Sequence, residues 1–150
     1  MRSRRLVVVV VASVLFLPLF PPTTALARDL PGPCHLHAED GETVQAFAAR
    51  TIRCAVRRLG PVPGDAARAL CIARRESGLN PSATSSTGKY RGLFQHARKY
   101  WDWRYETFTK PAWELPERVL HGRTNAVVTV RMVRGSGNWK DAGWPVKNCR

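Results

Sequence analysis

Four cysteines constrain the fold of this chain more than any other feature, because they are spread over most of its length: Cys34, Cys54, Cys71 and Cys149. An even number of cysteines in a short exported chain predicts that all are paired, and four cysteines allow three pairings. We expect a Cys54–Cys71 bond, because these residues lie at similar distances on either side of the Gly- and Pro-rich break at residues 60–64. A Cys34–Cys149 bond would then join the ends of the domain.

The start of the chain has the pattern of a secretory signal peptide, which fits the oxidising environment that disulfides require. Basic residues precede an apolar run over residues 6–20, and the small-residue sequence Ala25-Leu26-Ala27 follows. This run is interrupted by Pro18 and is shorter than the ~20 residues that span a bilayer as a helix. We therefore expect residues 1–27 to be removed on export, leaving no stable membrane span.

The rest of the 150-residue chain has the length of one domain. Residues 28–40 contain Pro31, Gly32 and Pro33 and have no apolar period, so they are predicted to form an extended N-terminal arm. Residues 41–150 are predicted to form a single domain. One fold must then carry whatever activity the protein has.

The composition suggests nucleic-acid binding and metal binding, but no sequence motif supports either function. The formal net charge is +13, which attracts a protein to anionic polymers. The basic residues are spread along the chain without a nucleic-acid-binding motif, so a solvated surface explains them more simply than specific nucleic-acid binding. Cys34, His35 and His37 cluster, but their spacing matches no zinc pattern, and we expect no metal and no other cofactor.

The apolar spacing predicts a mainly α fold. Residues 44–59 have apolar side chains at helical intervals and are followed by Gly60 as a stop. A second helix is predicted from Asp65, as its N-cap, to Gly78, a glycine suited to a left-handed helix end. Residues 78–92 are rich in small and polar side chains and are predicted to form a long surface loop.

The second half of the chain gives weaker signals. Pro116 and Gly122 bracket a short predicted helix. Residues 125–133 fit the spacing of either a helix or a strand, and their propensity favours a strand. The tail from Gly135 onward is predicted to be loop.

Glu76 is the candidate acid, because it lies at the end of the second predicted helix and beside its apolar stripe. The negative end of the helix dipole and partial burial both raise the pKa of a carboxyl group. A carboxyl that keeps its proton near neutral pH is able to protonate a glycosidic oxygen. From composition alone, an ordinary surface glutamate beside Arg74 and Arg75 is the simpler interpretation.

A resemblance over residues 66–144 reverses that judgement. The run from Ala69 to Pro81, which contains Glu76-Ser77, resembles the catalytic Glu-Ser helix end of the lytic transglycosylases, which share the lysozyme-like fold with goose-type lysozymes. The run from Arg91 to Gln95 resembles the Gly-Leu-Met/Phe-Gln cleft motif of this SLT-type family. Asn125-Ala126 resembles the family's third, helical element and favours a helix over residues 125–133. The end of the chain, with Gly137-Asn138-Trp139 and Trp144, resembles its C-terminal pattern.

The resemblance implies a lysozyme-like helical domain that cleaves the bond between N-acetylmuramic acid and N-acetylglucosamine in peptidoglycan. Glu76 would be the catalytic acid, and the implied cleft residues are Ser77, Gly92, Gln95 and Asn125. Tyr90 is expected beside the substrate too, because tyrosine rings stack on sugar faces. The expected partners are peptidoglycan glycan strands and anionic wall polymers, and the expected location is secreted or at the cell wall.

The reaction outcome stays open at this point. The family usually has a tyrosine after the Asn-Ala helix that supports the catalytic glutamate, whereas no tyrosine follows Tyr105 here. We expect lytic transglycosylation, because a single carboxylate suffices when the muramic acid's own hydroxyl completes the reaction. Hydrolysis as in a lysozyme (muramidase) is one alternative, for which Asp102 and Glu106 are candidate second carboxylates. A non-catalytic cationic wall-binding protein is the other.

Overall fold

The computed structural model describes residues 32–145 and 148–149. The predicted signal peptide, residues 1–27, and the first part of the predicted arm lie outside the described residues. Within the described part the chain forms four α-helices and a short two-stranded hairpin, and its cysteines make two disulfides. The predicted mainly α class with disulfides is therefore confirmed. None of these described helices combines the length and the apolarity needed to cross a membrane.

The first two helices form where the apolar spacing predicted them. Helix α1 spans Val44–Leu59, and the Oγ1 of Thr43 caps its start by accepting from the Ala46 amide at 3.1 Å. Helix α2 spans Asp65–Ser77 and ends at Gly78, which adopts the predicted left-handed conformation with φ of 63°. The predicted N-cap is wrong by one residue, because Gly64 takes that position and no side chain caps α2.

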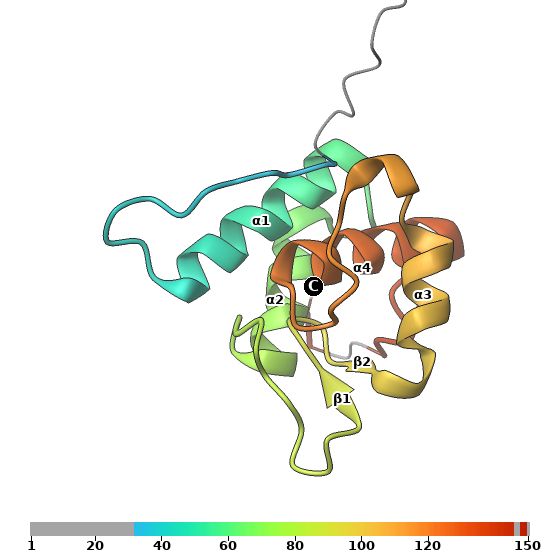
Figure 1. Ribbon diagram of the computed structural model, residues 1–150. Coiled ribbons are helices and arrows are strands. Elements are labelled where there is room, and N and C mark those ends of the chain that lie inside the picture. Colours follow the sequence, from blue (N-terminus) through green and yellow to red (C-terminus); the bar gives the residue numbers. More distant parts are fainter. Residues whose placement is uncertain (1–31, 146–147, 150) are drawn as a thin grey trace, which may run out of the picture.

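Helix α4, Gly122–Ser136, is the centre of the fold and lies between α1 and α3 (Figure 1). Every residue from 124 to 130 is buried. The apolar face is therefore not confined to one side of the helix, as expected for a helix enclosed by the rest of the domain. Residues 125–133 are helical. The strand that their residue propensities favoured does not form, whereas the helix that the resemblance favoured does.

The short helix predicted between Pro116 and Gly122 does not form. Gly122 is the first residue of α4, and the Nδ1 of His121 accepts from the Thr124 amide at 3.3 Å. A glycine beside a helix therefore marked its beginning here and not its end.

A hairpin and a short helix complete the described fold. Strand β1, Tyr90–Arg91, pairs antiparallel with β2, His96–Ala97, and the hairpin projects from one end of the helices (Figure 1). A 3₁₀ turn over Arg98–Tyr100 leads into helix α3, Trp101–Phe108, which lies on the side of α4 away from α1, and a second 3₁₀ turn covers Pro111–Trp113. After α4 the chain returns to the hairpin, where the ring of Trp144 packs edge-on against Phe94.

Both predicted disulfide pairings are wrong, because the observed bonds are Cys34–Cys54 and Cys71–Cys149. The prediction considered how far each cysteine lies from the break between α1 and α2, but not the direction in which each side chain points. Cys54 is buried on α1 and meets the arm, whereas Cys71 is only partly buried on α2 and meets the end of the chain.

Hydrogen bonds from two arginines hold the arm in the position that the first disulfide needs. Arg123 of α4 donates to the carbonyl oxygens of Gly32 at 2.7 Å and Pro33 at 2.9 Å. Arg50 of α1 donates to the carbonyl oxygen of His37 at 2.7 Å. The arm consequently runs back along α1 (Figure 1), and Cys34 reaches Cys54 instead of the other end of the chain.

Candidate active site

Glu76 lies in the last turn of α2, between two adjoining hollows in the surface. The first, which we call the Glu76 hollow, has a volume of about 220 Å³ and is lined by Glu76, Tyr90, Gln95, Gly143 and Trp144. The second, which we call the small hollow, has a volume of about 110 Å³ and is lined by Ile72, Arg75, Glu76, Trp144 and Pro145. Glu76 and Trp144 line both, so the carboxyl group and the indole form the boundary between them. Among the described residues, Glu76 is the only carboxylate that lines either hollow.

The surroundings of Glu76 favour its protonated form. The residue is exposed as a whole, but neighbouring protein atoms partly bury its carboxyl group and displace some of the water around it. This loss of hydration raises the pKa of Glu76, and the nearby positive charge of Arg75 partly opposes the rise. The carboxyl is therefore both accessible to a ligand and shifted toward the state that donates a proton.

Gln95 is held in a conformation that non-glycine residues rarely adopt. Its φ is 48°, in the left-handed region, which indicates local strain of about 1–3 kcal/mol at the wall of the Glu76 hollow. Its Nε2 donates to the carbonyl oxygens of Gly92 at 3.0 Å and Ala83 at 3.2 Å. Both amide protons are thereby used within the fold, so the side-chain oxygen is the part of the amide that remains for a ligand.

Asn125 fixes the turn that carries Gln95 and lines neither hollow. It is fully buried on α4; its Oδ1 accepts from the Phe94 amide at 3.0 Å and its Nδ2 donates to the Val119 carbonyl at 2.9 Å. Among the predicted cleft residues, Asn125 is thus one that the structure does not bring to the Glu76 hollow. The Nε1 of Trp144 donates to the Phe94 carbonyl at 2.8 Å, so both backbone polar groups of Phe94 are held by side chains. We call these two contacts, from Asn125 and Trp144, the clamp on Phe94.

Gly92 also has a structural role, and it lines neither hollow. It is buried with φ of 82°, and a Cβ placed on it would lie 2.2 Å from the Nδ2 of Asn125 and 2.5 Å from the Val119 oxygen. Only glycine allows the turn to approach α4 this closely. The glycine in the motif from Arg91 to Gln95 is thus explained by its contact with Asn125, which belongs to the Asn125-Ala126 motif.

Ser77 connects the end of α2 to the same turn. Its Oγ lies 3.0 Å from the Ala73 carbonyl oxygen and 2.8 Å from that of Leu93, and a hydroxyl has one proton to donate to them. Ser77 is partly buried and does not line either hollow. Ser77 therefore links the helix end that carries Glu76 to the turn that carries Gln95, and these two residues line one hollow.

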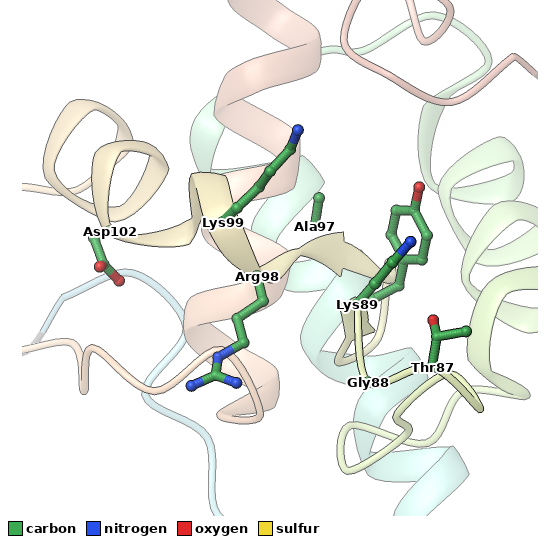
Figure 2. A pocket seen from close by; sticks show the side chains of 8 residues that line it. Thr87, Gly88, Lys89, Ala97, Arg98, Lys99 and Asp102 are labelled. Carbon is green, nitrogen blue, oxygen red and sulfur yellow. The ribbon is translucent and has the colours of Figure 1, made fainter.

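Tyr90 lies where the Glu76 hollow meets a larger one. It is 48% exposed, as expected for a ring that a ligand could cover. The larger opening, which we call the basic hollow, has a volume of about 650 Å³ and lies beside the hairpin (Figure 2). Its lining includes Tyr90 together with Lys89, Arg98 and Lys99. Asp102 lines this hollow as well, so it lies away from Glu76 and lines neither of the hollows there.

Sequence reasoning did not assign a site role to Trp144 or Gly143, which line the Glu76 hollow from the end of the chain. The adjacent residues Gly143 and Trp144 were the sequence signal that could have indicated this role. Other aromatic residues that follow Tyr90 in the sequence do not line the Glu76 hollow. Phe94 and Trp101 are buried, whereas Trp103 is 59% exposed and packs against Phe108.

A buried histidine stabilises the floor behind the site. His96 is fully buried, and the guanidinium of Arg104, which only donates, lies 2.9 Å from its Nδ1. The ring proton is therefore on Nε2, which donates to the Thr129 hydroxyl at 2.8 Å, and that hydroxyl donates to the Asn125 carbonyl at 2.8 Å. Burial, with the charge of Arg104 as the second cause, lowers the pKa of His96 to about 3.

Comparisons of this chain with protein-family models, with curated proteins and with solved structures found no match. The geometry of the site and the chemistry of its residues therefore carry the functional argument.

Proposed function

We propose that this protein is a lysozyme-like, peptidoglycan-cleaving enzyme that acts as a lytic transglycosylase outside the cell. The observation that carries the proposal is the position of Glu76: an accessible carboxyl with a raised pKa that lines two hollows, one of them together with Gln95. The same two residues are the key positions of the motifs that resemble the transglycosylase family. A coincidence of sequence motif and site geometry is stronger support than either alone.

The proposed reaction needs one carboxyl group. Glu76 donates its proton to the glycosidic oxygen as the bond from that oxygen to the muramic acid breaks. The resulting carboxylate then accepts the proton of the muramic acid's own hydroxyl, whose oxygen bonds to the same sugar carbon and forms an anhydro ring. Glu76 is protonated again at the end, and no water is consumed. The lack of a second carboxylate among the described lining of the two hollows agrees with this scheme.

The other lining groups have roles that follow from their chemistry. Tyr90, which is 48% exposed, presents aromatic surface on which a sugar ring is able to stack, whereas Trp144 is 6% exposed and forms a wall of the hollow. The Gln95 side-chain oxygen is able to accept a hydrogen bond from the amide of an N-acetyl group. The Asn125 and Trp144 clamp on Phe94 holds these groups before the substrate arrives, which is the condition for effective acid catalysis.

The proposal is tested by digesting purified peptidoglycan and analysing the released fragments by mass spectrometry. We expect anhydro-muramic ends from the wild-type protein, and at least about 100-fold slower release from Glu76→Gln. Glu106→Gln is the matched control, since Glu106 is an exposed carboxylate on α3 outside the hollows, and it should release fragments at the wild-type rate.

Other results would favour the alternatives. Reducing ends, which are heavier than anhydro ends by one water, would identify a hydrolytic muramidase. Binding to the wall without release of fragments would identify a non-catalytic wall-binding protein. Undiminished release by Glu76→Gln would refute the assigned acid.

A further inference from the structure

The basic hollow beside the hairpin is not used by the proposed cleavage, although it adjoins the Glu76 hollow at Tyr90. Its three cations come from the two sides of the hairpin base, where the Arg98 amide donates to the Lys89 carbonyl at 2.9 Å. Lys99 follows in the 3₁₀ turn, and its Nζ lies 4.5 Å from the centre of the Tyr100 ring. The cations are thus mounted on a hydrogen-bonded part of the fold.

These cations are available to a ligand. The ion pairs found among the described residues join Arg50 to Glu39 and Glu42, and none involves Lys89, Arg98 or Lys99. Asp102 is the one carboxylate of the lining, so the hollow keeps an excess of positive charge. An anionic ligand would therefore form ion pairs that the described part of the fold does not already make, and Lys99, which lies over the Tyr100 ring at 4.5 Å from its centre, would add an ion pair to that contact.

The directions of the side chains indicate what kind of anion fits. Figure 2 shows Arg98 and Lys99 extending to opposite sides from adjacent positions, with Lys89 on the hairpin arm across from them. Charges that diverge in this way do not converge on a single phosphate or sulfate group. They suit an extended chain that carries carboxylates at intervals.

We propose that the basic hollow binds the carboxylate-bearing peptide stem of the same peptidoglycan strand whose glycan occupies the Glu76 hollow. This inference rests on the proposed function, and continuity at Tyr90 supports it. The peptide stem is attached to the muramic acid, so a strand placed for cleavage brings its carboxylates to the neighbouring surface. A wall polymer with phosphate groups has no such link to the scissile sugar.

The test measures binding to the Glu76→Gln protein, which keeps the basic hollow and does not consume the ligand. The probes are soluble glycan fragments with their peptides, the same fragments after an amidase has removed the peptides, and polyglycerol phosphate. We expect the peptide-bearing fragments to bind more tightly than the stripped fragments, and Arg98→Gln with Lys99→Gln to reduce that preference by about three- to tenfold. Arg58→Gln with Lys140→Gln removes the same charge from exposed positions outside the hollows and should preserve the preference.

Two outcomes would overturn the inference while leaving the proposed function in place. One is equal affinity for peptide-bearing and stripped fragments. The other is tightest binding to polyglycerol phosphate through Arg98 and Lys99, which would make the hollow a site for phosphate polymers. If neither glycan fragment binds and the wild-type protein releases nothing from peptidoglycan, the proposed function itself fails.

Discussion

At the scale of the single residue, the protonation of Glu76 is set by two opposing effects on one carboxyl group. Partial burial by neighbouring protein atoms removes hydration and raises the pKa of Glu76, whereas the charge of Arg75 lowers it. Arg75 and its neighbour Arg74 are both exposed in the last turn of α2, yet only Arg75 lines the small hollow with Glu76. Substituting Arg75 and Arg74 one at a time therefore separates the effect of a charge beside Glu76 from the effect of a change in the net charge of the protein.

We predict that the rate of peptidoglycan cleavage falls as the pH rises through the raised pKa of Glu76, because the general acid must be protonated. Arg75→Gln should move this limb to higher pH, since it removes the charge that lowers that pKa. Arg74→Gln should leave the limb in place. The measurement is the pH dependence of kcat/KM on soluble glycan fragments, and equal displacement by both substitutions would contradict the prediction.

Gly92 gives a second prediction at this scale. Gly92→Ala should lower the free energy of unfolding by about 2–4 kcal/mol, because the new Cβ is strained at positive φ and overlaps Asn125 and Val119. Gly41→Ala is the matched control: its φ is 73° and nothing lies within 4 Å of the added Cβ, so only the backbone strain of about 1 kcal/mol remains. Urea unfolding measures both, and equal losses would show that contact with α4 does not matter.

At the scale of the elements, helices α1 and α2 could be predicted because their signals are local. Each has an apolar stripe at helical spacing and a glycine at its end. Helix α4 gave an ambiguous pattern for a physical reason, since burial on all sides removes the contrast between an apolar and a polar face. The disulfide pairing depends on the path of the arm and the tail, which no local pattern encodes.

The candidate site divides in a similar way. Glu76, Tyr90 and Gln95 were expected at the site, and they line one hollow. Asn125 was among the expected cleft residues, and it lies inside α4, where its side-chain amide satisfies backbone groups of Phe94 and Val119 outside that helix. Trp144 was missed because its role depends on the tail folding back to Phe94.

The contact between the hairpin and α4 predicts acid sensitivity through His96. Its pKa is about 3 in the folded protein against an ordinary 6.5, so the unfolded chain binds a proton over this range and the folded one does not. The stability contributed by neutral His96 is therefore complete above about pH 6.5 and is lost as the pH falls toward 3, with a slope approaching about 1.4 kcal/mol per pH unit.

The free energy of unfolding between about pH 6.5 and 5 tests this prediction, because most carboxyl groups titrate below that range. His96→Gln should flatten the slope, since an amide does not titrate but is able to accept from Arg104 and donate to Thr129. The slope, and not the absolute stability of the variant, is the quantity compared. An unchanged slope would mean that His96 takes up its proton equally in the folded and unfolded states.

At the scale of the whole molecule, the Glu76 hollow is assembled from three separate parts of the chain. Helix α2 supplies Glu76, the hairpin supplies Tyr90 and Gln95, and the tail supplies Gly143 and Trp144. The tail is attached to the rest of the fold at other points too. The Cys71–Cys149 bond and a hydrogen bond from the Nε of Arg68 to the Cys149 carbonyl at 2.7 Å hold its end, and the Nε1 of Trp139 donates to the Pro63 carbonyl at 2.8 Å.

The two disulfides should therefore differ in their effects on stability and on activity. In the chain-entropy account, a bond across 78 residues contributes about 4.5 kcal/mol and one across 20 residues about 3 kcal/mol. We predict that Cys71→Ser with Cys149→Ser loses more unfolding free energy than Cys34→Ser with Cys54→Ser.

The variant without the Cys71–Cys149 bond should also lose cleavage activity under conditions where it stays folded, because the wall formed by Trp144 is then held by fewer contacts. The variant without the Cys34–Cys54 bond should keep that activity, since the arm that it releases does not line the Glu76 hollow. Urea unfolding and fragment release measured on both variants provide the comparison, and equal activity of the two folded variants would mean that the tail keeps its position without the covalent link.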